Sequence, residues 1–196
     1  MKYNCKLGSD IMKKYLGTDD LQKRLEHSEG VAEFAFKVAQ QIKGNNPELT
    51  SFEPEFVGFL GYVHDIGYSV EAEKHETHTV DLLNEREGIY AKRARMAMHG
   101  QLVEQFGEIE GNVEQYMPHG IEGMILTYAD MSVRTGGPIA LKDRAEEIVE
   151  RVKGIPGMPD QLKLDIETNL YKALPRFEKY ERIVLALAGV ESVKDF

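Results

Sequence analysis

The chain has 196 residues, of which 42% are hydrophobic, and a formal net charge of −9 at pH 7. This length and apolar content suit one domain, residues 1–196, with a sizeable core. The single cysteine, Cys5, excludes a disulfide framework and a cysteine-type zinc site. The negative charge argues against binding to nucleic-acid backbones. The N-terminus has no apolar leader and no apolar run approaches about 18 residues, so we expect a cytoplasmic protein without membrane partners.

Hydrophobic residues recur at three- and four-residue steps along nearly the whole chain, and convincing strand alternation is absent, so we expect an all-α fold. A short helix should open at Ser9-Asp10 and end at Leu16. The next, capped by residues 18–20, carries an apolar stripe between His27 and Lys43. Pro54 suits the first turn of a helix that runs to Ile66.

The remaining expected elements are helices over residues 72–85, 89–106, 121–133, 141–152, 160–174 and 176–189, with a glycine-rich loop over residues 107–120. Pro175 should separate the last two helices. The metal-binding core is expected over about residues 20–135. The helices of residues 138–190 are expected to cover this core or to form an oligomer surface, and not to make a second domain.

His64 and Asp65 stand side by side at the end of an apolar helix that the sequence predicts to be buried. Burying two ionisable groups is costly unless something satisfies them, and a divalent metal would do so. The alternative is an ordinary helix C-terminus with Gly67 as its left-handed stop. His27 and Asp130 lie on the inward faces of two other expected helices. Either could be a hydrogen-bonded or solvated residue by itself, but together the four favour a site for Mn, Fe, Co, Ni or Zn.

These separated motifs resemble the HD superfamily of metal-dependent phosphohydrolases. The segment Leu25-Glu26-His27-Ser28 is similar to the family's first-histidine helix, Val63-His64-Asp65-Ile66-Gly67 to its signature, and Ile125-Leu126-Thr127-Tyr128-Ala129-Asp130 to its last-aspartate helix. The resemblance implies a compact helical bundle with the metal site at its centre and extra C-terminal helices.

In dinuclear branches of this family, two further histidines hold a second ion. The resemblance assigns these roles to His75 and His99, with Asp65 as the bridge between the ions. His78 lies on the same expected helix face as His75 and could take its place, although His75 fits the family spacing better. His119, in a Pro-His-Gly setting, is expected at the surface. The implied ligand set for one or two divalent ions is His27, His64, Asp65, His75, His99 and Asp130.

The sequence departs from the family pattern at two points. Tyr68 stands where the family often has a lysine, which leaves the substrate contact of that lysine unassigned. The branch that hydrolyses cyclic dinucleotides carries a His-His pair and a Gly-Tyr-Pro motif. Here His99 is followed by Gly100 and no Gly-Tyr-Pro occurs, which argues against that branch.

The chemistry implied by the resemblance is attack of metal-activated water on phosphorus, centred on His64 and Asp65. Positive side chains should hold the phosphate oxygens, because no glycine-rich phosphate loop is present. Arg95 and Arg134, each about one helical turn from a proposed ligand, are the first candidates. Arg24 and Lys74 are further candidates.

Three functions remain open from the sequence. The first is hydrolysis of a phosphoester in a nucleotide or another small phosphorylated metabolite. The second is oxygen activation by a di-iron site built from the same six ligands. The third is a non-catalytic metal-binding module. The expected partners are a small phosphorylated substrate and, as a homodimer, a second copy of the chain.

Overall fold

A computed structural model describes residues 2–100, 103, 113–134 and 137–196. The helices are α1 (Cys5–Leu16), α2 (Gln22–Asn45), α3 (Pro54–Val63), α4 (His75–Asp81), α5 (Ala91–Ala94), α7 (Gly120–Asp130), α8 (Leu141–Lys153) and α9 (Asp160–Ala188). Short 3-10 helices are η1 (Asp19–Leu21), η2 (Ile66–Ser69), η4 (Arg95–Ala97), η5 (Val113–Tyr116) and η6 (Val193–Asp195), and η3 (Leu82–Arg86) is a π-helical turn. The all-α bundle predicted from the sequence is confirmed.

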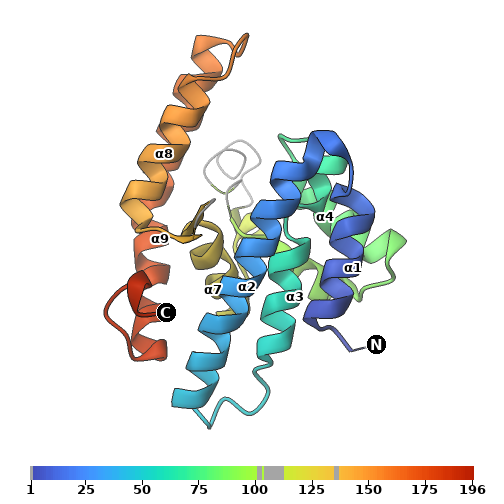
Figure 1. The fold of residues 1–196 in the computed structure, drawn as a ribbon, viewed down its shortest axis with the longest axis vertical. Helices are drawn as coiled ribbons and strands as arrows, with labels where there is room; N and C mark the ends of the chain where they lie inside the picture. Colours follow the sequence, from blue (N-terminus) through green and yellow to red (C-terminus); the bar gives the residue numbers. More distant parts are fainter. Residues whose placement is uncertain (1, 101–102, 104–112, 135–136) are drawn as a thin grey trace.

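Helices α2 and α3 lie side by side through the middle of the bundle, with α1 packed on the other side of α3 (Figure 1). Seven of the ten residues of α3 are buried. Gly61 permits the close approach of the two central helices, because a Cβ at this position would lie 2.5 Å from the Ala32 Cα atom. The approach matters for the site, since α2 carries His27 and α3 leads directly into His64.

Helix α7 packs against α2 and α3, and α9 packs against α2 and α7. The C-terminal part of α9 therefore belongs to the bundle. Its N-terminal part forms a hairpin with α8 that extends beyond the end of the bundle (Figure 1). A two-stranded antiparallel ribbon, β1 (Val133–Arg134) and β2 (Gly137–Pro138), connects α7 to α8. None of the described helices combines the length and apolar composition that a membrane-spanning segment needs.

The structure corrects several predicted boundaries near the N-terminus and the signature. Helix α1 begins at Cys5 because the side chain of Asn4 caps it by accepting from the Leu7 amide. Helix α3 ends at Val63, before Ile66. Gly67 is not a left-handed stop, since its φ is not positive. It is buried where a Cβ would lie 1.9 Å from the His75 carbonyl oxygen, so glycine is required there by close packing.

Two longer predictions were also wrong. The expected helix over residues 89–106 is broken after η4, and His99 lies in a non-helical segment that Gly100 continues with a φ of +79°. The expected break at Pro175 does not occur, because α9 runs through it. A proline inside a helix costs about 3 kcal/mol. Burial of Ala173 and Phe177 against the start of α8 offsets that cost. Of the predicted loop at residues 107–120, residues 107–112 lie outside the described part of the chain, and the rest includes the short helix η5.

Candidate metal centre

Six side chains from five parts of the chain meet at the centre of the bundle in two groups. The ligand atoms within each group lie within 4.8 Å of one another. The first group, from here the α2 group, is His27, His64 and Asp130. The second, from here the α4 group, is Asp65, His75 and His99. All six residues implied as ligands by the resemblance are therefore brought together.

Local structure brings each ligand to the centre. Helix α2 presents His27, the end of α3 presents His64 and Asp65, and the last residue of α7 is Asp130. His75 is the first residue of α4, and its backbone carbonyl packs closely against Gly67. The five more deeply placed ligands are buried, while the His27 side chain is 14% exposed and marks the open side of the site.

Backbone carbonyl oxygens orient the imidazole rings. The Nδ1 atom of His64 is 2.8 Å from the Gly61 carbonyl oxygen, and that of His75 is 2.9 Å from the Ala72 carbonyl oxygen. Each Nδ1–H donates to its carbonyl, so the Nε2 lone pair of each ring faces the centre. This is the arrangement in which proteins present histidine to a metal.

Asp65 lies between the two groups. Its Oδ1 atom is 3.5 Å from the Nε2 atom of His64 and 3.5 Å from the Nε2 atom of His75. Asp130 also reaches both sides: its Oδ1 atom is 2.8 Å from the Nε2 atom of His27, and its Oδ2 atom is 3.9 Å from the Nε2 atom of His99. The two groups thus form one continuous cluster, with Asp65 placed as a bridging ligand would be.

The cluster has unsatisfied polar atoms that a cation would satisfy. The Nε2 atom of His64 is buried and has no hydrogen-bond partner among the described residues. The Nε2 atoms of His75 and His99 lie 3.3 Å apart, so at most one of them can donate to the other. Buried polar groups normally have partners. The nitrogen and oxygen donors therefore fit divalent transition metals.

Electrostatics keeps the carboxylates ionised. Burial raises the pKa of Asp65, but the positive charges of His64 and Arg24 outweigh it and hold the pKa well below its usual range. Burial likewise opposes the low pKa of Asp130, which the hydrogen bond from His27 and the nearby imidazoles of His64 and His99 produce. Burial lowers the pKa of His64, yet Asp65 and Asp130 together raise it to about 9. Without an ion, His64 thus carries the proton that balances the carboxylates.

The pKa of His75 shifts the other way, because burial lowers it below its usual value. At neutral pH its imidazole is uncharged, which is the form that binds metals. The α4 group therefore offers one ionised carboxylate and a neutral imidazole, whereas a metal entering the α2 group must displace the proton of His64.

Residues that the sequence reasoning missed hold the ligands in place. The buried carboxylate of Glu76 accepts from the backbone amides of His99 and Gly100 at 2.8 Å each, and so fixes the non-helical His99 segment. Thr127 donates to the His99 carbonyl oxygen. Thr79 accepts from the Gly67 amide and donates to the His64 carbonyl oxygen. Their position directly beside predicted ligand motifs is the one signal in the sequence that could have identified them.

Arg24 is the cation that contacts the cluster. Its Nη1 atom donates to the Asp65 Oδ2 atom at 3.3 Å, and its guanidinium lies 3.9 Å from the Tyr68 ring centroid. The Tyr68 ring also stacks with the imidazole of His75, and the two ring centroids are 4.2 Å apart. Tyr68, at the position where the family often has lysine, thus orients an arginine from α2 next to the Asp65 carboxylate.

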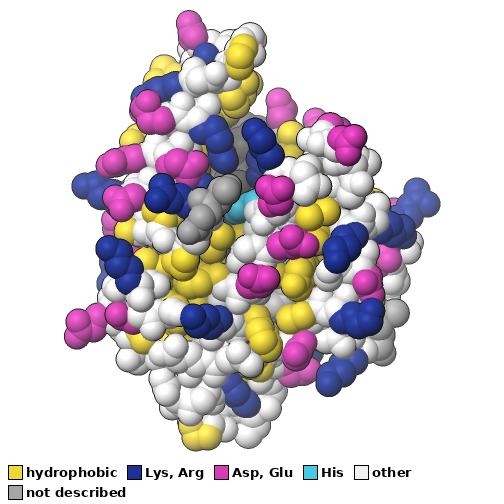
Figure 2. Space-filling model, in the orientation of Figure 1, with side chains coloured by type: hydrophobic (Ala, Val, Ile, Leu, Met, Phe, Trp, Pro, Cys, Tyr) yellow, Lys and Arg dark blue, Asp and Glu magenta, His cyan; other side chains and the backbone are white. Residues whose placement is uncertain are grey.

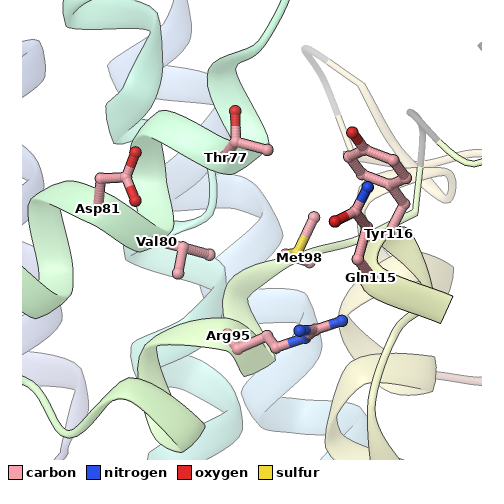
Figure 3. A pocket seen from close by; sticks show the side chains of 7 residues that line it. All are labelled: Thr77, Val80, Asp81, Arg95, Met98, Gln115 and Tyr116. Carbon is pink, nitrogen blue, oxygen red and sulfur yellow. The ribbon is translucent and has the colours of Figure 1, made fainter. Parts of the chain in front are cut away.

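The structure does not bring Arg95 to the ligand cluster. Its guanidinium donates to the His119 Nε2 atom and to the Glu114 carbonyl oxygen. It lines a separate cavity of about 180 Å³ with residues that include Met98 and Tyr116 (Figure 3). His119 is exposed, in agreement with its expected surface position.

The other candidates divide between the site and the surface. His78 does not join the cluster, because its side chain points to Glu71, with the Nε2 atom 3.2 Å from that carboxylate. His75 is therefore the histidine of α4 that joins the cluster. Lys74 is exposed at the start of α4. Arg134 is exposed and, with His27, lines a cavity of about 450 Å³ along α2. It therefore lies at the open side of the α2 group.

Comparison with known proteins agrees with the fold and the ligand cluster. The chain matches the family model of the HD domain over residues 24–133, which is more than half of its length. The chain belongs to the HD domain family, and so to a superfamily of metal-dependent hydrolases that bind divalent metals. No curated protein and no solved structure matches it. The family therefore defines the class, and the substrate must be argued from the site.

Proposed function

We propose that the chain is a phosphohydrolase that uses two divalent ions to cleave a phosphoester of a nucleotide or another small phosphorylated metabolite. The observation that supports this most strongly is the position of Asp65 between two groups of ligands, within 3.5 Å of a histidine in each. Divalent ions held there supply Lewis-acid chemistry that activates water towards phosphorus.

The chain's own residues would bind and orient the substrate. Arg24 is fixed by Asp65 and Tyr68, so its remaining guanidinium donors are placed to hold phosphoryl oxygens next to the bridging carboxylate. Arg134 lies with His27 at the open side of the site and is available for a second contact. Arg95 has no part in this proposal, because its guanidinium is engaged by His119 and Glu114.

A small substrate fits the site better than a polymer does. The proposed ligands are mostly buried, and the opening is formed at His27 and Arg24, whose side chains are 14% and 34% exposed. The net charge of −9 would also repel an extended nucleic-acid backbone.

Phosphate release is the test. The protein would be stripped of metal, reloaded with Mn²⁺ or Co²⁺, and assayed against a panel of nucleotides and other small phosphoesters. We expect metal-dependent release of phosphate or nucleoside, and loss of at least about 99% of this activity in Asp65→Asn. The exposed substitution Lys142→Gln is the control.

The alternatives have distinct outcomes. Absence of release across the panel, with stoichiometric metal bound, would overturn the proposal. In that case, retained iron whose absorption spectrum changes on exposure to oxygen would favour the di-iron oxygenase. A protein with bound metal but neither activity would be a binding module.

A further inference from the structure

Helix α8, which lies outside the residues matched by the family model, carries two arginines on one face. Arg144 and Arg151 are seven residues apart, which is close to two helical turns, so their side chains project in nearly the same direction. Their Cα atoms are about 10 Å apart along the helix axis, from the rise of about 1.5 Å per residue. Together they form a basic strip along α8.

Arg144 is a buried cation with unused hydrogen-bonding capacity. Its side chain is 6% exposed and pairs with Glu147 one turn further along the helix. Its Nε atom is buried and has no partner among the described residues. Leaving a donor of a charged group buried and unpaired is costly. An anion that accepts this donor would remove the cost.

Arg151 continues the strip about two helical turns further along α8. Its side chain reaches solvent, but neighbouring protein atoms remove part of its hydration and lower its pKa, and the like charges of Arg144 and Arg24 lower it further. Glu147 and, more weakly, Tyr68, on which Arg24 stacks, act on Arg151 in the opposite direction. The three guanidinium groups therefore share one electrostatic environment, which also contains the Glu147 carboxylate.

The surface has the corresponding shape. Lys and Arg side chains stand on both sides of the opening between the α8 hairpin and the end of the bundle, and a histidine is visible just below them (Figure 2). This concentration of positive charge occurs in a chain whose net charge is −9. Glu147 pairs with Arg144 and offsets part of the repulsion between these like charges, and a bound anion would offset more of it.

We propose that Arg144 and Arg151 bind a second phosphate group of the substrate, while the scissile phosphate lies at the metal centre beside Arg24. This inference rests on the proposed function and deepens it. The preferred substrates would carry at least two phosphate groups, as nucleoside diphosphates, nucleoside triphosphates and bisphosphates do. Guanidinium groups suit this role because their paired N–H donors match two phosphate oxygens.

Binding measurements test the inference without relying on turnover. Metal-loaded protein would be titrated calorimetrically with inorganic phosphate and with methylenebisphosphonate, a non-hydrolysable compound with two phosphonate groups. Its metal content would be measured again afterwards, because bisphosphonates chelate metals. We expect the wild-type protein to bind methylenebisphosphonate at least about 10-fold more tightly than phosphate, and Arg151→Gln to lose about 10-fold towards methylenebisphosphonate alone.

Two further variants sharpen the comparison. Lys142→Gln removes an exposed charge from the same helix and should leave both affinities unchanged, which excludes a general loss of attraction. Arg144 is buried, so Arg144→Lys is used to preserve the charge and the fold. It should weaken methylenebisphosphonate binding, because an ammonium group cannot reproduce the planar fork of donors.

The outcomes separate this inference from the proposed function. If Arg151→Gln binds methylenebisphosphonate as the wild type does, or loses affinity for both probes in equal proportion, the second phosphate site is refuted. If the panel of phosphoesters is not hydrolysed but the selective loss occurs, the anion site stands and the catalytic proposal fails.

Discussion

His75→Gln tests the α4 group directly, and His78→Gln is its matched control on the same helix. The Nε2 atom of His75 is 3.3 Å from that of His99 and 3.5 Å from the Asp65 Oδ1 atom, and its side chain is 4% exposed. The His78 side chain is 28% exposed and contacts only Glu71 among the charged groups of the described residues. Both substitutions replace an imidazole of α4 with a neutral amide.

The expected effect on the second ion is large. Removing a residue that merely orients a ligand typically costs about 10- to 100-fold in metal affinity. Loss of a direct ligand from a group of three should therefore cost about 100-fold or more, which is about 2.7 kcal/mol. The α2 group retains its three ligands and its ion. Loss of the stacking on Tyr68 should lower the free energy of unfolding by only about 1 kcal/mol.

The three proteins would be stripped of metal. Their Mn²⁺ affinity would be measured by calorimetry, and their metal content by elemental analysis after reloading with Mn²⁺ and removal of unbound metal. We expect two ions per chain in the wild type and in His78→Gln, and one in His75→Gln. Two tightly bound ions in His75→Gln, or loss of an ion from His78→Gln, would refute the assignment of the α4 group. Circular dichroism would verify that both variants are folded.

Three further predictions concern packing and protonation. Gly67→Ala should lower the free energy of unfolding by about 3 kcal/mol, because its Cβ would lie 1.9 Å from the His75 carbonyl oxygen; a melting temperature equal to that of the wild type would contradict this packing. The pKa of His64 in the metal-free protein is raised to about 9, so its stabilising contribution is complete below pH 6.5 and is lost as pH rises through about 9. The melting temperature of metal-free protein should therefore fall by roughly 5–10 °C over that interval, whereas a flat profile would refute the assigned protonation. Burial raises the pKa of Cys5 to about 12, so iodoacetamide should label the native thiol far more slowly than the unfolded one at pH 8, as mass spectrometry would measure.

Local sequence patterns predicted the residues that meet in the candidate metal centre. His27, His64, Asp65 and Asp130 were found because polar residues on otherwise apolar helix faces need a partner, and that need is visible in the sequence. The all-α class followed from hydrophobic periodicity, which the packing of α2, α3 and α7 preserves. The prediction of a single domain remains untested.

Tertiary contacts decided the properties that periodicity does not encode. His75 and His78 share a predicted helix face, but only His75 lies beneath Gly67 and faces the centre, because α4 is short and begins at that residue. By spacing, Arg95 was one of the first candidates for a phosphate contact and Arg24 only a further one. The stacking of Tyr68 and the charge of Asp65 hold Arg24 at the site, while His119 holds Arg95 elsewhere.

The chain therefore specifies its ligands locally and its substrate contacts globally. A metal ligand must be a histidine or carboxylate on an inward face, and this requirement restricts the sequence at each position. A phosphate contact needs only a positive charge at the right distance, and the chain has 24 lysines and arginines. Which of them lie near the metal centre depends on how α8 packs beside the bundle, and that is determined by contacts between residues far apart in the sequence.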